Sequence, residues 1–191
     1  MRKIKMLNRV SLDGYFASLN EAANGMDWFV QDPEVDLAVR AHDSRADTLL
    51  LGAETFRLFE KSWVPIKNDP NAPEQLIAIA EELTEMTKIT FSTKLRKSDW
   101  ENSLFYDGDL LNVVKNLKKE EGSDILILGS GSIVQQLADH RLIDEYFFIV
   151  TPVVAGTGKQ LFKDTQQFGL TLLNIQAFSS GNVLLHYGLK E

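Results

Sequence analysis

The stretch ILILGSGSIVQQL, residues 125–137, places four apolar residues directly before Gly129-Ser130-Gly131-Ser132, and a run suited to a helix follows. This pattern predicts a buried strand over residues 124–128, a glycine turn, and a helix over residues 133–142. Glycines let the backbone approach a ligand closely, and the free N–H groups at a helix start attract anions. Taken alone, these residues leave phosphate binding and a plain packing corner equally open.

Strand-like and helix-like segments alternate along the rest of the chain. Asp13-Gly14 predicts a turn, Asp32-Pro33 a helix start, and the three prolines between residues 64 and 73 a surface loop. We expect further strands over residues 4–10, 48–52, 88–92 and 145–151. We expect further helices over residues 35–46, 74–86 and 109–121, and one that begins with residues 53–59. We also expect a hairpin formed by 170–178 and 183–189. The alternation predicts a single α/β domain over residues 1–191.

Composition and charge narrow the functional classes. The 191 residues are 44% hydrophobic and 25% charged, which is typical of a globular domain with a sizeable core. A formal charge of −7 argues against a broad basic surface for nucleic acid or anionic membrane, so a small-molecule partner is expected. We predict no metal site, because the chain has no cysteine and His42, His140 and His186 lack metal-ligand spacing. The absence of a signal-peptide or transmembrane pattern favours a cytoplasmic location.

Two well-known phosphate motifs do not fit. A dinucleotide fingerprint requires a third glycine where this chain has Val134. A P-loop reading of Gly156-Thr157-Gly158-Lys159 fails because Val153 replaces the first glycine and Gln160 replaces the final Ser or Thr.

Five segments occur in an order typical of one family: SLDGYFA (11–17), TLLLGAETF (48–56), ITFSTKL (89–95), ILILGSGSIVQQL (125–137) and DEYFFIVTPVVAGTGKQLF (144–162). By these motifs the chain resembles the dihydrofolate-reductase-like superfamily, and within it the RibD C-terminal reductase domain of riboflavin biosynthesis, as a stand-alone member. The resemblance implies a three-layer fold with a mostly parallel central sheet, helices on both faces and an antiparallel C-terminal hairpin. It also implies NADPH as cofactor and a homodimer, with YFFIVTPVV (146–154) contributing to the interface.

The resemblance assigns cofactor-binding residues. The two glycine turns would hold the diphosphate, Phe16 would cover the nicotinamide, and the segment after residue 91 would bind the 2′-phosphate. These residues are Phe16, Gly52, Ala53, Thr55, Ser92, Thr93, Lys94, Gly129, Ser130, Gly131, Ser132 and Ile133. Ala53 stands where the family often has arginine, which leaves NADPH and NADH both open.

The resemblance also suggests an active-site acid. Counting back from Gly52 without a gap, the family's carboxylate falls on Asp36, where it would bind a heterocycle nitrogen or relay a proton in an apolar cleft. The alternative is that Asp36 merely complements the helix dipole in a first turn. Asp13 is expected to hold its turn.

The substrate pocket would be shaped by Arg9, Trp28, Phe56 and Leu128. Arg9 would bind an anionic group or, as we favour, pair with a carboxylate. The implied reaction is hydride transfer to a C=N or C=O carbon, and the implied substrate is 5-amino-6-(5-phosphoribosylamino)uracil. We see no deaminase half with zinc ligands, and no clear basic pocket for the ribose phosphate apart from Arg9 and Lys159. A stand-alone oxidoreductase acting on a pterin-like or carbonyl substrate, or a non-catalytic nucleotide-binding homodimer, therefore stays open.

Overall fold

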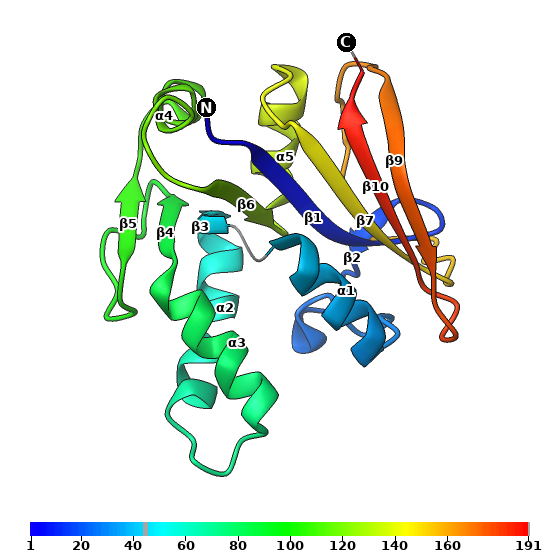
Figure 1. Cartoon of the computed structure of the whole chain (residues 1–191), viewed down its shortest axis with the longest axis horizontal. Helices are drawn as coiled ribbons and strands as arrows, with labels where there is room; N and C mark the ends of the chain where they lie inside the picture. The colour runs from blue at the N-terminus through cyan, green and yellow to red at the C-terminus, as the bar shows by residue number, and fades with distance from the viewer. Residues whose placement is uncertain (44–45, 191) are drawn as a thin grey trace.

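The computed structural model describes residues 1–43 and 46–190, and within them a single large sheet forms the middle layer (Figure 1). Its strand order is β5-β4-β3-β6-β1-β7-β10-β9. Strands β5 to β7 in that order pair in parallel, whereas β10 pairs antiparallel with both β7 and β9. The strands are β1 (Ile4–Ser11), β3 (Ala46–Gly52), β4 (Thr87–Phe91), β5 (Ser103–Tyr106), β6 (Asp124–Leu128), β7 (Glu145–Thr151), β9 (Leu170–Ala177) and β10 (Val183–Leu189).

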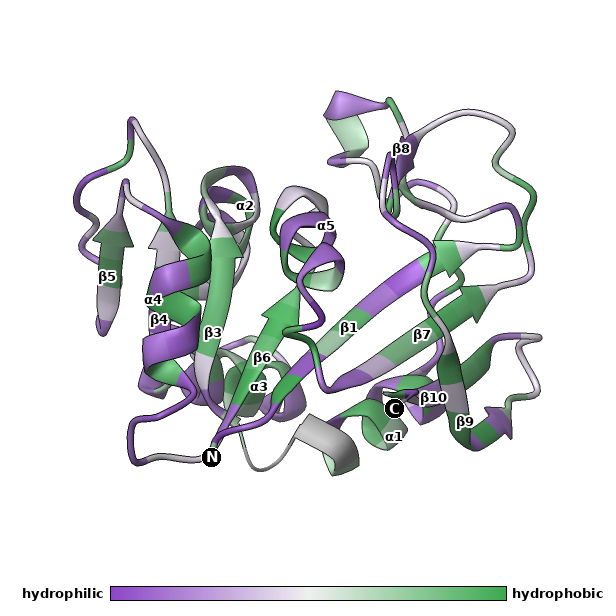
Figure 2. Cartoon of the chain, turned by 90° about the horizontal axis from the view of Figure 1, so that it is seen from above, coloured by the Kyte–Doolittle hydropathy of each residue, from purple (hydrophilic) through white to green (hydrophobic). Residues whose placement is uncertain are grey.

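Helices cover both faces of the sheet. Helices α1 (Pro33–Asp43), α2 (Ala53–Lys67) and α3 (Glu74–Glu85) contribute to one apolar cluster, and α4 (Leu110–Leu117) and α5 (Gly131–Asp139) contribute to the other. Strand β1 serves both clusters, because Met6 faces the α4 and α5 side while Leu7 faces the opposite side. The parallel strands β3 and β6 are apolar along most of their length (Figure 2), as burial on both faces requires.

A small ribbon lies outside this sheet. Strand β2 (Tyr15–Ala17) pairs antiparallel with β8 (Lys159–Gln160), and a short 3₁₀ turn, η1 (Glu21–Ala23), follows β2. The sequence pattern did not predict strands β2, β5 and β8. Among the described residues, no helix has the length and apolar character needed to cross a bilayer.

The α/β fold and most element positions agree with the sequence predictions, with three corrections. The loop expected over residues 64–73 begins later, because α2 continues through Pro65 to Lys67. Proline is tolerated there because the helix is ending, and the Asn68 side chain donates to the Val64 carbonyl at 2.9 Å. Helix α5 starts at Gly131 and ends at Asp139, earlier than predicted, and α4 likewise ends at Leu117 rather than near residue 121. The end of the helix predicted over 35–46 falls partly on residues 44–45, outside the described residues.

The third correction concerns the strand predicted to form a dimer interface. Strand β7 lies between β1 and β10 rather than at an edge, and Tyr146, Phe147 and Ile149 are buried in the core. Only the loop after the strand is open, where Val154 is 71% exposed. The apolar, β-branched run predicted the strand correctly, but it cannot reveal which neighbours cover the strand.

Candidate active site

A cleft with a volume of about 1640 Å³ opens at the carboxyl ends of the parallel strands. Its wall includes the residues that end β3, β4 and β6, the first turns of α2 and α5, and the β2–β8 ribbon. Ligands of open α/β sheets bind at this edge, because the loops that follow the strands converge there. The fold therefore gathers the glycine turns of the sequence in one place.

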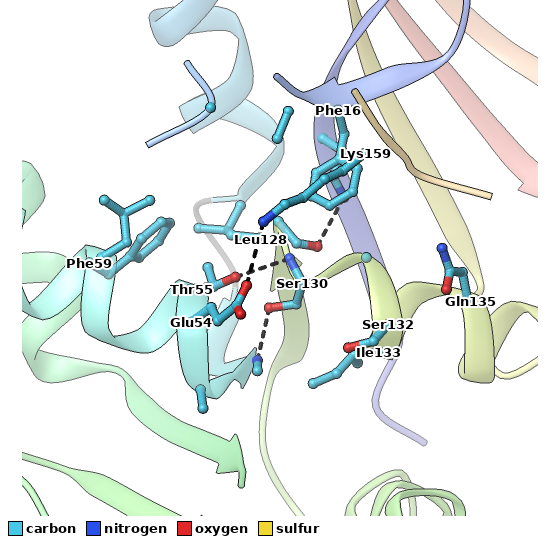
Figure 3. Close-up of a pocket in the computed structure, with 18 of the residues that line it drawn as sticks. Phe16, Glu54, Thr55, Phe59, Leu128, Ser130, Ser132, Ile133, Gln135 and Lys159 are labelled. Carbon is cyan, nitrogen blue, oxygen red and sulfur yellow. Dashed lines mark hydrogen bonds and ion pairs between the residues drawn. The ribbon is translucent and has the colours of Figure 1, made fainter. Parts of the chain in front are cut away.

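Ser130 joins the two glycine turns directly (Figure 3). Its hydroxyl accepts a hydrogen bond from the Gly52 N–H at 2.9 Å, and its own N–H donates to the Thr55 hydroxyl at 3.2 Å. Gly129 has a φ of 62°, and a Cβ there would lie 3.2 Å from the Thr55 methyl group. The starts of α2 and α5 are thus held side by side with their axes ending at the same cleft.

These helix starts can hold an anion. The first N–H groups of an α-helix have no intrahelical acceptor, and the helix dipole gives them a partial positive charge. Because the N–H groups of Gly52 and Ser130 bind each other's turns, the next residues provide the donors for a ligand: Ala53 and Glu54 in α2, and Gly131 and Ser132 in α5. A diphosphate matches two such helix starts.

Phe16 forms an aromatic wall beside α5. A Cβ on Gly131 would lie only 2.8 Å from two atoms of the Phe16 ring, so the close approach depends on glycine. The ribbon that carries Phe16 is tied to α5, because the Gln135 side chain donates to the carbonyls of Gln160 and Leu161 at 3.3 and 3.0 Å.

Asp13 anchors the ribbon from its other side. Its carboxylate accepts from the Ser11 hydroxyl at 2.6 Å and from the N–H groups of Ala155 and Gly156 at 2.9 and 2.7 Å. The hydrogen bond from Ser11, together with those from the backbone, lowers the pKa of Asp13 to about 2. Asp13 therefore has the structural role expected from its place beside Gly14.

The segment after β4 contributes fewer residues to the cleft wall than predicted. Ser92 and Thr93 line the cleft, but Lys94 lies outside its wall. The Ser92 hydroxyl accepts from the N–H groups of Lys94 and Leu95 at 3.1 and 2.7 Å, so it stabilises the turn. The stacked rings of Phe91 and Tyr106, 5.8 Å apart, add a flat apolar surface that the sequence analysis missed.

Arg9 and Asp36 meet at the far side of the cleft. An Arg9 Nη2 atom lies 2.7 Å from Asp36 Oδ1, and the Asp36 side chain is 53% exposed, more open than the apolar setting we expected. Asp32, one helical turn earlier, also senses the Arg9 charge. The pKa of Asp32 is lowered, chiefly by a hydrogen bond from Ser180 and in smaller part by Arg9. Arg9 thus faces two carboxylates, which agrees with the pairing we favoured.

Comparison with known proteins identifies the family. The profile of the RibD C-terminal domain matches residues 2–184. The chain belongs to this family. It is 32% identical over 188 residues to the uncharacterized protein YyaP of Bacillus subtilis, covering 97% of this chain and 94% of YyaP.

Solved structures share the RibD-like fold. A putative riboflavin biosynthesis protein from Shewanella superposes with a TM-score of 0.73 at 19% identity, covering 99% of each chain. A diaminohydroxyphosphoribosylaminopyrimidine deaminase/5-amino-6-(5-phosphoribosylamino)uracil reductase from Thermotoga maritima superposes with a TM-score of 0.65 at 17% identity, covering 99% of this chain and 57% of that one.

Within this RibD-like fold, two predicted substrate residues lie away from the cleft. Phe56 is fully buried and packs on Trp100 and Phe105, with ring centroids 5.5 and 5.2 Å apart, so its assignment was wrong. The Phe56 side chain lies on the face of α2 that packs into the core, and it does not reach the cleft. Trp28 packs edge-on against Phe29, and Phe29 lines the cleft in its place. The predicted residues that do line it are Arg9, Phe16, Asp36, Gly52, Ala53, Thr55, Ser92, Thr93, Leu128, Gly129, Ser130, Gly131, Ser132 and Ile133.

Proposed function

We propose that this protein is an NADPH-dependent reductase that transfers a hydride to a C=N or C=O carbon of a small heterocyclic or sugar-imine substrate. The observation that carries the proposal is the hydrogen-bonded pair of turns at Ser130, which presents two helix starts to one cleft. Membership of the RibD C-terminal domain family supports the same reaction class.

The cleft fits a dinucleotide and a second molecule together. Its volume of about 1640 Å³ exceeds the range of about 300–1,000 Å³ typical of a pocket for one small ligand. The N–H groups at the starts of α2 and α5 would hold the diphosphate, the rings of Phe91 and Tyr106 would contact the adenine, and Thr93 would reach the ribose phosphate. When bound, NADPH supplies the hydride, and the protein supplies position and a proton.

Asp36 is the best-placed group for the proton. Its Oδ1 atom is oriented by Arg9, whereas its Oδ2 atom makes no hydrogen bond to the described residues. That oxygen can accept an N–H from a heterocycle or hold a proton close to a substrate nitrogen. Arg9 therefore acts as a positioning residue, because a carboxylate fixed on one side has fewer orientations to lose when substrate binds.

The substrate we place first is 5-amino-6-(5-phosphoribosylamino)uracil, but the charges of the cleft favour a second candidate. Arg9 is paired with Asp36, and Lys159 lies 3.6 Å from Glu54. The ionisable residues of the wall are Arg9, Lys159 and Lys163 against Glu21, Asp36, Glu54, Asp107 and Asp109. Such a wall holds a neutral ring better than a phosphate ester, so a pterin-like or carbonyl substrate without a phosphate is the alternative.

Cofactor binding is the first experiment. Purified protein is titrated with NADPH and, separately, with NADH while the nicotinamide fluorescence is followed. We expect saturable binding and then oxidation of NADPH when the phosphoribosyl substrate or its dephosphorylated form is added. Absence of binding by both dinucleotides would refute the proposal. Binding without turnover on any candidate would leave the protein a non-catalytic nucleotide-binding module.

Replacing the acid separates its role from cofactor binding. We expect Asp36→Asn to keep the NADPH dissociation constant within twofold and to lower turnover by about 100-fold, the size of effect typical of a lost general acid. The measurement is the rate of NADPH oxidation at saturating cofactor. Turnover equal to that of the wild type would remove Asp36 from the mechanism.

A further inference from the structure

The start of α2 carries a charge that opposes a bound diphosphate. Ala53 provides no cation, and the next side chain, Glu54, is negatively charged and 91% exposed in the first helical turn. An acidic residue there stabilises the helix itself through the dipole. It also repels an anion that approaches the same N–H groups, so a diphosphate needs a compensating positive charge nearby.

Lys159 supplies that charge from a different element. Its Nζ atom lies 3.6 Å from Glu54 Oε2, although 105 residues separate the two in sequence. Figure 3 shows the lysine side chain reaching from the Phe16 side of the pocket toward Glu54. The ammonium therefore lies beside the start of α2, and Lys159 forms part of the cleft wall.

The backbone of Lys159 is fixed while its side chain is loosely held. Ala17 pairs with Lys159 in the ribbon, and Gly158 packs so closely on it that a Cβ would lie 2.5 Å from the Ala17 carbonyl. The ion pair with Glu54 is long and more than half exposed at both side chains, so it contributes little to stability. Lys159 therefore has a fixed backbone and an ammonium that is only weakly bound to Glu54. Such an ammonium can move to a new partner when a ligand binds.

We propose that Lys159 is the cationic ligand of the cofactor diphosphate: its ammonium moves from Glu54 to the diphosphate oxygens when the dinucleotide binds. This inference rests on the proposed function, since it concerns the same cofactor site. Because NADPH and NADH share the diphosphate, Lys159 strengthens the binding of both and does not select between them. Glu54 opposes binding twice, by repelling the anion and by competing for the lysine.

The test is a set of fluorescence titrations with NADPH and with NADH. We expect Lys159→Met to weaken both by the same factor, about 10-fold, the equivalent of one lost ion pair. We expect Glu54→Gln to tighten both several-fold, and Lys159→Arg to retain most of the affinity. If the ion pair were only structural, Glu54→Gln and Lys159→Met would change affinity in the same direction, which would overturn the proposal.

Controls distinguish this inference from the proposed function. Lys119→Met removes an exposed lysine outside the cleft wall and is expected to leave both affinities unchanged. Inorganic pyrophosphate should raise the melting temperature of the wild type more than that of Lys159→Met, a readout independent of turnover. Wild-type protein that binds neither dinucleotide would reject the proposed function and this inference with it. Wild-type binding with unchanged affinity in Lys159→Met, or a loss confined to NADPH, would reject this inference alone.

Discussion

Ser130 holds together the two turns of the proposed cofactor site. It has a φ of 53°, a left-handed conformation that is unfavourable for residues with a Cβ, and it is only 6% exposed. The strained backbone persists because both its N–H and its hydroxyl are bonded to the turn at the start of α2. One side chain therefore couples two helix starts that would otherwise be set independently.

Removing this hydroxyl is expected to loosen the site. Ser130→Ala leaves the part-buried Gly52 N–H without its acceptor, so we expect a loss of about 1–2 kcal/mol in the free energy of unfolding, and weaker NADPH binding. Ser130→Gly also loses the hydroxyl but relieves the φ strain, and it should be more stable than Ser130→Ala. Urea unfolding measures both. The exposed Ser132, changed to alanine, is the control, and an unchanged stability in Ser130→Ala would contradict the coupling.

Lys88 is a second residue with an unusual setting, far from the cleft wall. It is fully buried, its ammonium donates to the carbonyls of Leu83, Thr84 and Met86 at 2.8–2.9 Å, and it lies 4.6 Å from the centre of the Trp100 ring. These carbonyls belong to the end of α3, where helices leave acceptors unpaired. Lys88 therefore caps a helix from inside the protein.

Replacing Lys88 should affect stability and its pH dependence. We expect Lys88→Met to cost about 2–4 kcal/mol, because three buried carbonyls lose their donor. Burial lowers the pKa of Lys88 from 10.5 to about 8. Between these values the unfolded chain binds the proton and the folded chain releases it, so the wild type gains stability as the pH rises from about 8 to about 10.5.

The measurement is the free energy of unfolding across that pH range in both proteins. Lys88→Met should lack the gain seen in the wild type. Lys115→Met, at an exposed position of α4, should keep it. A parallel pH dependence in Lys88→Met and the wild type would assign the slope to other groups.

At the scale of elements, the sequence predicts segments whose signal is local. The apolar runs of β3 and β6 and the glycine turns after them are visible in short windows. Strands β2 and β8 are not, because they have three and two residues and pair across more than 140 positions of sequence. Strand β5 is short and lies at an edge, and none of its four residues is buried. The missed elements are those defined by distant partners.

The ribbon formed by β2 and β8 is expected to depend on Asp13. Asp13→Asn removes the charge that accepts from Ala155 and Gly156, so the loop leading to β8 should open more often. Because the pKa of Asp13 is lowered to about 2 in the folded protein, the anchoring is complete above about pH 4 and is lost as the pH falls through about 2. Hydrogen exchange of the Ala155 and Gly156 amides measures this opening.

We expect faster exchange of these two amides in Asp13→Asn, and weaker NADPH binding because Phe16 and Lys159 are carried by the ribbon. Asp99→Asn, an exposed carboxylate in the loop between β4 and β5, is the control and should leave the exchange unchanged. Identical exchange in Asp13→Asn and the wild type would show that Asp13 does not anchor the ribbon.

At the scale of the whole molecule, the sequence predicted most residues of the cleft wall but not the ion pairs between them. Family motifs located the two glycine turns and Asp36. The pairs that give the cleft its charge pattern, Arg9 with Asp36 and Lys159 with Glu54, join segments that no local pattern connects. Phe56 was misassigned for a related reason: sequence position gives its helix, but packing decides which way its side chain points.

Strand β9, rather than the predicted β7, carries a run of exposed apolar side chains. Leu172, Leu173 and Ile175 are 50, 55 and 59% exposed, and in the described part of the chain β9 ends the sheet with β10 as its neighbour there. An open edge with large apolar side chains favours association. We propose that a second copy of the chain covers β9 in a homodimer, the assembly that the family resemblance implies.

This dimer can be tested at both edges of the same sheet. We expect sedimentation velocity to give a dimer for the wild type and a monomer for Ile175→Lys, because a charge at the buried contact would have to be desolvated. Leu104→Lys places the same charge at a 48% exposed leucine on β5, the opposite edge strand, and should remain dimeric. A monomeric wild type would reject the homodimer. Dissociation by Leu104→Lys, with a dimeric Ile175→Lys, would move the interface to β5.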